Sequence, residues 1–311
     1  MPNKIGFLFP GQGAQYVGMG KDLFEKNGSA RSVYDKADQI LGYSLREICF
    51  QGPEDRLKRT AYAQPAIFVT SLAALAVLKE KFPELAADFS AGLSLGEFSA
   101  LTAAGAISFE QGLLLVKKRA EAMEACSQKY PGTMASILGL SVADCKAVTD
   151  EAGCELANLN SPDQIVISGT LESIDKACKI AEAKGAKRVV PLKVGGAFHS
   201  RLMQESRQAL ETALKEVQIN PPQGIFIPNA SAQKVSNPAE IRDLLAKQLT
   251  SPVRWIETMI RAQEEGIDFC LEIGPGKVLK GLAKRSAPAM TVEPCGTLED
   301  IEKIESLFVQ K

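Results

Sequence analysis

Histidine is almost absent from this 311-residue sequence, since His199 is the only one. The seven cysteines are odd in number, scattered, and never in C-x-x-C spacing. A catalytic zinc site needs clustered histidine and cysteine ligands, so no metal is expected, and no cofactor is expected either. Scattered cysteines of this kind are typical of reduced thiols, so the sequence predicts a cytoplasmic protein.

An excess of charge and long apolar runs are also missing. The net charge is −1, so bulk electrostatics indicates neither nucleic acid nor an anionic membrane as a partner. The apolar run within residues 1–10 is too short for a signal peptide, and no later stretch approaches the ~18 uninterrupted apolar residues of a membrane span. With 45% hydrophobic residues, the chain can bury one large core or two unequal ones.

The glycine motifs that bind nucleotides are also missing from the sequence. A buried strand is predicted at residues 5–9, and it leads into a glycine-containing loop at residues 10–15. Tyr16 occupies the place of the third glycine in a G-x-G-x-x-G motif, and no G-x-x-x-x-G-K-[ST] motif occurs. A nucleotide-binding fold is therefore disfavoured.

One serine, Ser94, is framed as Gly-x-Ser-x-Gly, between Gly92 and Gly96. A short strand is predicted at residues 86–91 and a helix at residues 96–105, which is the strand, serine, helix order of a nucleophile elbow. Such a turn would aim the Leu95 N–H at the reaction centre, at the positive end of the helix. Taken alone, the motif is equally compatible with an ordinary turn between a strand and a helix.

His199 is the only histidine that could activate such a serine. A serine hydroxyl is a poor nucleophile near neutral pH until a base removes its proton, and histidine is suited to that task. If the chain performs serine chemistry with a histidine base, His199 is that base. Activity is then expected to rise with pH around the imidazole pKa, near 6.5 if the group is unperturbed.

Arg119 is unusual because of its helical neighbours. In the helix predicted at residues 109–129, it shares a face at i, i+3, i+4, i+7 spacing only with apolar residues. A buried guanidinium is costly unless an anion meets it, and its own face supplies no acid. Two interpretations remain open: an acid from elsewhere in the fold pairs with Arg119, or Arg119 is kept free for a substrate carboxylate.

The pattern of predicted elements changes after residue 129. Helices are predicted at about 17–41 and 64–82, and later apolar strands at 224–228 and 268–273. Between them, short elements follow in the order β-α-β-β-α-β, which resembles a ferredoxin-like unit. These elements are predicted at 134–138, 142–152, 155–160, 164–168, 171–184 and 188–192.

Several motifs together resemble the malonyl-CoA:acyl carrier protein transacylase family of bacterial type II fatty acid synthesis. The resemblance covers essentially the whole chain, and the motifs occur in order along it. They are residues 10–15 (PGQGAQ), 63–66 (AQPA), 92–97 (GLSLGE), Arg119, 195–200 (GGAFHS), 248–255 (QLTSPVRW) and 272–279 (EIGPGKVL).

The resemblance implies an α/β fold with an α/β-hydrolase-like large domain, residues 1–129 and 197–311, and an inserted ferredoxin-like small domain, residues 130–196. The active site would lie between the two. Malonyl-CoA and acyl carrier protein are the implied partners. Ser94 would attack the malonyl thioester and His199 would take its proton, in a Ser-His dyad with ping-pong kinetics.

The resemblance also assigns roles to other residues. The backbone N–H groups of Gln12 and Leu95 would hold the oxyanion, Arg119 would bind the malonyl carboxylate, and the Gln248 backbone carbonyl would orient the imidazole. Three further residues are expected to bind substrate: Gln64, Asn160 and Phe198. Gln64 and Asn160 could equally be structural amides, while the Phe198 ring would leave little room for an α-methyl group.

One position departs from the family pattern, because Leu93 stands where a histidine usually precedes the nucleophile. The imidazole that would touch the acyl group is lost, so the fine acyl selectivity is left open. Two other functions stay open: a serine hydrolase, which would need an aspartate and has no use for Arg119, and a catalytically inactive module that binds the carrier protein.

Acyl carrier proteins are acidic, so docking is expected at basic residues, namely Lys284, Arg285, Lys187 and Arg188.

Overall fold

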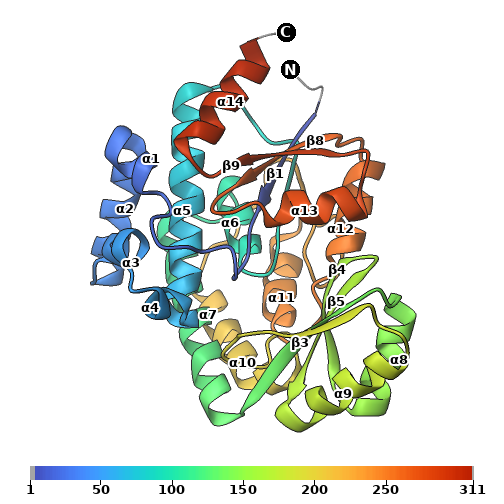
Figure 1. Cartoon of the computed structure of the whole chain (residues 1–311). Helices are drawn as coiled ribbons and strands as arrows, with labels where there is room; N and C mark the ends of the chain where they lie inside the picture. Colours follow the sequence, from blue (N-terminus) through green and yellow to red (C-terminus); the bar gives the residue numbers. More distant parts are fainter. Residues whose placement is uncertain (1–3, 310–311) are drawn as a thin grey trace.

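The protein has a mixed α/β fold with one parallel and one antiparallel sheet (Figure 1). The computed structural model describes residues 4–309. The parallel sheet has the strand order β7 (Ile225–Phe226), β2 (Phe89–Gly92), β1 (Ile5–Phe9), β8 (Phe269–Ile273) and β9 (Thr291–Cys295). The antiparallel sheet has the order β4 (Glu155–Ser161), β5 (Gln164–Thr170), β3 (Gly132–Leu138) and β6 (Arg188–Pro191).

The parallel sheet is covered on both faces, as its continuous apolar strands predict. Side chains alternate across a strand, and along β1 they enter two different cores. Phe7 and Phe9 belong to the core that contains α5 and α7, whereas Leu8 packs with residues of α12 and α13. The sheet is thus enclosed between two layers of helices, and the turn at the carboxyl end of β2 is held from both sides.

The helices around this sheet come from both ends of the chain. Before the antiparallel sheet they are α1 (Lys21–Lys26), α2 (Gly28–Leu41), α3 (Leu45–Gln51), α4 (Glu54–Lys58), α5 (Thr60–Lys81), α6 (Gly96–Ala103) and α7 (Phe109–Lys129). After it they are the 3₁₀ turn η1 (Arg201–Met203), α10 (Gln204–Lys215), α11 (Pro238–Gln248), α12 (Trp255–Glu264), α13 (Val278–Ser286) and α14 (Leu298–Val309).

Between β3 and β6 the element order predicted from the sequence is present. Helices α8 (Val142–Ala152) and α9 (Leu171–Ala183) pack on the antiparallel sheet and share a separate core with it. In Figure 1 this unit lies at the end of the molecule away from the two termini. It joins the rest of the protein through β4, where the Leu159 N–H donates to the Val253 carbonyl at 2.9 Å. That bridge holds the end of β4 beside the carboxyl edge of the parallel sheet.

Several predicted boundaries were wrong. The helix predicted at 17–41 is two helices that meet at Asn27, whose extended backbone interrupts them. Helix α5 begins four residues before the predicted start at residue 64, because the Glu124 carboxylate accepts the Ala61 N–H at 2.9 Å and stabilises an additional first turn. Only two residues of the strand predicted at 224–228 pair in the sheet.

Helix α5 is apolar along most of its length, although polar residues such as Gln64, Thr70 and Ser71 interrupt it. By length and composition this helix could span a membrane, with a mean hydropathy of 1.7 in its apolar window. However, 83% of its apolar window is buried inside the protein, as expected for the core helix of a globular domain. A core helix surrounded by other elements is apolar on all sides, which explains why its sequence passes the same test.

Candidate active site

Ser94 lies in a sharp turn between β2 and α6. Its φ of 53° falls in the left-handed region, which a residue with a side chain rarely adopts. Both flanking glycines are required by close packing. A Cβ on Gly92 would lie 1.9 Å from the Gly96 carbonyl carbon, and one on Gly96 would lie 2.1 Å from the Phe9 oxygen. The turn therefore has the strained geometry that the Gly-x-Ser-x-Gly motif predicts.

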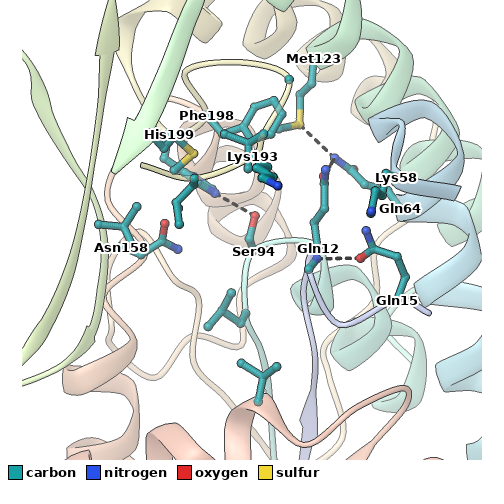
Figure 2. A pocket seen from close by; sticks show the side chains of 18 of the residues that line it. Gln12, Gln15, Lys58, Gln64, Ser94, Met123, Asn158, Lys193, Phe198 and His199 are labelled. Atoms are coloured by element: carbon teal, nitrogen blue, oxygen red, sulfur yellow. Dashed lines mark hydrogen bonds between the residues drawn. The ribbon is translucent and has the colours of Figure 1, made fainter. Parts of the chain in front are cut away.

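His199 meets Ser94 across the site, as Figure 2 shows. The Ser94 Oγ lies 2.8 Å from His199 Nε2, and His199 Nδ1 lies 2.9 Å from the Gln248 backbone oxygen. Because a carbonyl only accepts, Nδ1 carries the proton and Nε2 is left free to accept the serine hydroxyl. His199 also has a positive φ, 59°. Ser94 and His199, which contact each other in space, therefore both have strained backbone geometry, and such strain is concentrated at functional sites.

The His199 imidazole titrates far from its ordinary value. Burial, and after it the positive charge of Arg119, lower its pKa to about 4, although hydrogen bonds to Gln248 and Ser251 act in the opposite direction. The value near 6.5 used for the sequence prediction therefore does not hold for this buried group. Near neutral pH the imidazole is uncharged, which is the form that can act as a base.

Arg119 is almost completely buried, with 1% of its surface exposed. Its guanidinium donates to Gln64 Oε1 at 2.6 Å, to Ser94 Oγ at 2.9 Å and to Gln248 Oε1 at 2.9 Å. No carboxylate forms an ion pair with it within residues 4–309. Burial lowers its pKa to about 10, opposed by the charge of Glu97, so it stays positive at neutral pH. A buried cation thus contacts the serine oxygen itself.

Two backbone N–H groups beside Ser94 have no partner. Neither Gln12 nor Leu95 donates a backbone hydrogen bond to any residue in the described part of the chain. Leu95 stands at the N-cap of α6, so its N–H lies at the positive end of the helix. Both are free to donate to an oxyanion that forms on a carbonyl attacked by Ser94.

A cavity of about 430 Å³ opens over Ser94, which is large enough for an acyl group and part of its carrier. All the predicted substrate residues line it: Gln64, Asn160 and Phe198, together with Gln12 and Arg119. The Asn160 Oδ1 is buried without a partner among the described residues. The Gln64 amide is engaged, since its Oε1 binds Arg119 and its Nε2 approaches Gln12 Oε1 at 3.4 Å. Leu93 also lines the cavity.

The four predicted basic residues lie near one another. Arg285, on α13, donates to Gln164 Oε1 at 2.5 Å and lies 3.6 Å from Asp163. Gln164 and Arg188 both pair with Leu138 in the antiparallel sheet, and Lys187 precedes Arg188. Lys284 is exposed on the same helix. We call Lys187, Arg188, Lys284 and Arg285 the basic cluster, and its member Arg285 contacts Gln164, which lines the cavity.

Sequence reasoning missed two residues of the site. Asn229 binds the Ser94 backbone, since its Oδ1 accepts the Ser94 N–H at 2.7 Å. Glu97 is fully buried and accepts from the Asn229 N–H and the Gln248 side chain. Asn229 closely follows β7, and polar residues at the carboxyl ends of parallel strands commonly form sites, which is the signal that could have found it.

No metal centre accompanies this arrangement in the part of the chain that the structure covers. Within residues 4–309, no group of three or more His, Cys, Asp or Glu side chains is placed to hold a metal ion. The described site consists of a serine, a neutral imidazole, two free N–H groups and a buried cation. Such a set can carry out acyl transfer through a serine ester without further groups.

Comparison with known proteins agrees with this chemistry. Residues 6–302 match the family described as acyl transferase domain, so the chain belongs to that family of acyltransferases. A malonyl CoA-acyl carrier protein transacylase of Bacillus subtilis (strain 168) is 44% identical over 290 residues, which cover 91% of this chain and 90% of that protein. At this similarity the chain belongs to the malonyl CoA-acyl carrier protein transacylase family.

Solved structures share the whole fold. The crystal structure of acyl-carrier-protein-S-malonyltransferase from Bartonella henselae matches with a TM-score of 0.93 and 39% identity, covering 98% of this chain and 99% of that one. A second structure contains a type II PKS acyl-carrier protein in complex with its malonyl-transacylase. It matches with a TM-score of 0.93 and 34% identity, covering 97% of this chain and 98% of that one.

Proposed function

We propose that this protein transfers a malonyl group from malonyl-CoA to the phosphopantetheine thiol of acyl carrier protein, and so supplies the extender for fatty acid synthesis. The observation that carries the proposal is the position of Arg119. A buried guanidinium, which pairs with no carboxylate of the described residues, donates to the oxygen of a serine that a neutral histidine can deprotonate. A substrate that places a carboxylate near the acylated serine satisfies this cation.

The reaction proceeds in two half-reactions on Ser94. The Ser94 Oγ attacks the thioester carbon while its proton moves to His199 Nε2, and the resulting oxyanion accepts from the Gln12 and Leu95 N–H groups. The intermediate collapses, the C–S bond breaks, and the coenzyme A sulfur takes the proton from His199. The phosphopantetheine thiol then gives its proton to His199 and attacks the malonyl-serine ester. The ester C–O bond breaks, the malonyl group stays on the phosphopantetheine sulfur, and His199 returns the proton to the Ser94 Oγ. The Gln248 carbonyl keeps the imidazole in the tautomer that both steps need.

Arg119 is the group that selects malonyl. Its fork of donors can hold both oxygens of the malonyl carboxylate, with one NH₂ group leaving Ser94 Oγ once the ester forms. Gln64, whose amide already binds Arg119 and Gln12, orients the guanidinium in this account. Phe198 closes the cavity against α-branched acyl groups, and the unpartnered Asn160 Oδ1 binds a donor of the substrate. Leu93 contributes apolar surface where the family has an imidazole.

Acyl carrier protein docks at the basic cluster. Its acidic surface meets Lys284, Arg285, Lys187 and Arg188, and the phosphopantetheine arm enters the cavity past Gln164. The solved complex of a similar malonyl-transacylase with its carrier protein supports this kind of partner. Nucleic acid, membrane, metal and cofactor have no part in the proposed activity.

We further infer two units in the fold and a cytoplasmic location. Residues 1–129 and 197–311 form the α/β-hydrolase-like large domain and residues 130–196 the ferredoxin-like small domain; residues 1–3 and 310–311 lie outside the described residues. The separate core of the small unit and its strand order, β4-β5-β3-β6, support this division. All seven cysteines are free, which suits a reducing compartment.

Incubation with malonyl-CoA labelled in the malonyl group tests the proposal. A transacylase retains label on the protein and passes it to added holo acyl carrier protein. A serine hydrolase instead releases free malonate rapidly, and an inactive module that only binds the carrier protein takes up no label. Either of the last two results would refute the proposed transfer.

A further inference from the structure

Glu97 is a buried acid that the proposed reaction does not use. It lies three residues after Ser94, in the first turn of α6, and no part of it is exposed. Its Oε2 accepts from the Asn229 backbone N–H at 2.8 Å and from the Gln248 Nε2 at 2.9 Å. Its Oε1 has no partner among the described residues. Burying a carboxylate is costly, so this arrangement needs an explanation.

The contacts of Glu97 determine which way the Gln248 amide points. A carboxylate oxygen accepts from the amide nitrogen, which also donates to the Ser94 backbone oxygen at 2.9 Å. This leaves the amide oxygen toward Arg119, which donates to it at 2.9 Å. A flipped amide would place oxygen against the carboxylate and NH₂ against the guanidinium, and both contacts would be repulsive.

Glu97 also holds the residue that supports the strained turn. While the Asn229 backbone N–H binds Glu97, the Asn229 side chain accepts the Ser94 N–H at 2.7 Å and donates to the Gly92 oxygen at 2.8 Å. These two bonds clamp the turn on either side of Ser94, whose positive φ needs such support. One carboxylate oxygen is thereby connected, through single residues, to the nucleophile and the cation.

We propose that Glu97 is a positioning residue of the acyl transfer reaction, acting through its Oε2 as a fixed double acceptor for Gln248 and Asn229. The role rests on the proposed function for its substrate, but its direct effect is on the reactivity of Ser94. The competing explanation is that Glu97 acts only as a negative charge that balances buried Arg119.

Two conservative variants separate position from charge. In Glu97→Gln the amide oxygen can take the place of Oε2 and accept from both neighbours, while the negative charge is lost. In Glu97→Asp the charge is kept, but the shorter side chain withdraws the acceptor by more than an ångström. A displacement of about 1 Å can lower a rate by about 100-fold, whereas replacing a charge-assisted bond by a neutral one has a smaller effect.

The readout is the rate at which a fluorophosphonate probe labels Ser94, measured beside the rate of acylation by malonyl-CoA. We expect Glu97→Asp to lower both rates by about 100-fold and Glu97→Gln to lower them by less than about tenfold. Glu272 provides matched controls, because it is also fully buried and its carboxylate accepts the Leu279 and Lys280 N–H groups at 2.8 Å each. The same two changes at Glu272 should lower Tm and leave probe labelling of Ser94 unchanged.

The reverse order of the two variants would overturn the proposal. If Glu97→Gln is as slow as or slower than Glu97→Asp, the charge matters and the acceptor position does not. Unchanged labelling in both folded variants would make Glu97 a structural residue only. A wild-type protein that reacts with the probe and not with malonyl-CoA would refute the proposed function, and the probe would still test the role of Glu97.

Discussion

Replacement of Arg119 by alanine tests why a charge is buried beside Ser94. If the guanidinium binds the malonyl carboxylate, Arg119→Ala removes a charge-assisted contact that acetyl-CoA never makes. A hydrogen bond to a charged group contributes about 1.5–3 kcal/mol, which corresponds to roughly 10- to 150-fold in rate. The expected result is a shift of selectivity toward acetyl by that factor.

The structure also predicts a loss that both substrates share. Arg119 donates to Gln64, Gln248 and Ser94, so alanine leaves two buried amide oxygens without their donor. Each such oxygen costs about 1–3 kcal/mol of stability, and Tm should fall accordingly. The rate of acetyl transfer is therefore also expected to fall. Because this loss is common, the ratio of the two rates isolates the contribution of the carboxylate.

The assay is single-turnover acylation of Ser94 by malonyl-CoA and by acetyl-CoA, with folding checked by circular dichroism. Arg119→Lys serves as the matched variant, and it should restore malonyl transfer only in part, because an ammonium lacks the planar fork. A folded Arg119→Ala protein whose two rates fall by the same factor would refute the assignment. Arg119 would then be a structural residue that supports Gln64 and Gln248.

The remaining predictions concern the base, the cavity and the docking surface. Acylation limited by chemistry should rise with pH through the His199 pKa of about 4 and stay level above it, since the neutral imidazole is the base. Arg119→Ala removes a charge that lowers this pKa, so the rise should move to higher pH; a rise that stays in place would contradict the account. His199→Ala should lower transfer by about 10²–10⁴-fold, as loss of a general base does, and full activity would exclude it as the base. Phe198→Ala should increase use of methylmalonyl-CoA relative to malonyl-CoA in competition assays, and an unchanged ratio would remove Phe198 from the selectivity of the cavity. Lys284→Glu should slow transfer to carrier protein and weaken its salt dependence while acylation by malonyl-CoA is unchanged, with Lys215→Glu on α10 as the control; equal effects on both half-reactions would refute docking there.

The parts of the site that the sequence could predict depend on local patterns. The turn at Ser94 is fixed by glycines within two residues of it, and the apolar stripe around Arg119 follows helical spacing. A single histidine left no choice of base. In each case the information lies within a few turns of chain or in composition.

The remaining parts depend on contacts between distant segments. Asn229 lies 135 residues from Ser94, and Gln248 lies 151 residues from Glu97, so no local pattern links them. The predicted start of α5 was wrong for the same reason, because Glu124, from the distant helix α7, stabilises the first turn of α5. The pKa of His199 likewise depends on burial and on a charge from another helix. These features exist only once the two sheets and their helices have packed.

The most direct test of the account is to locate the malonyl group on the protein. After brief incubation with malonyl-CoA, the intact mass of the wild-type protein should increase by one malonyl group, and peptide mapping should place that group on Ser94. Added holo acyl carrier protein should remove it and become malonylated. Ser94→Ala should take up none. Malonylation that persists in Ser94→Ala, or an adduct that the carrier protein cannot remove, would contradict transfer through Ser94.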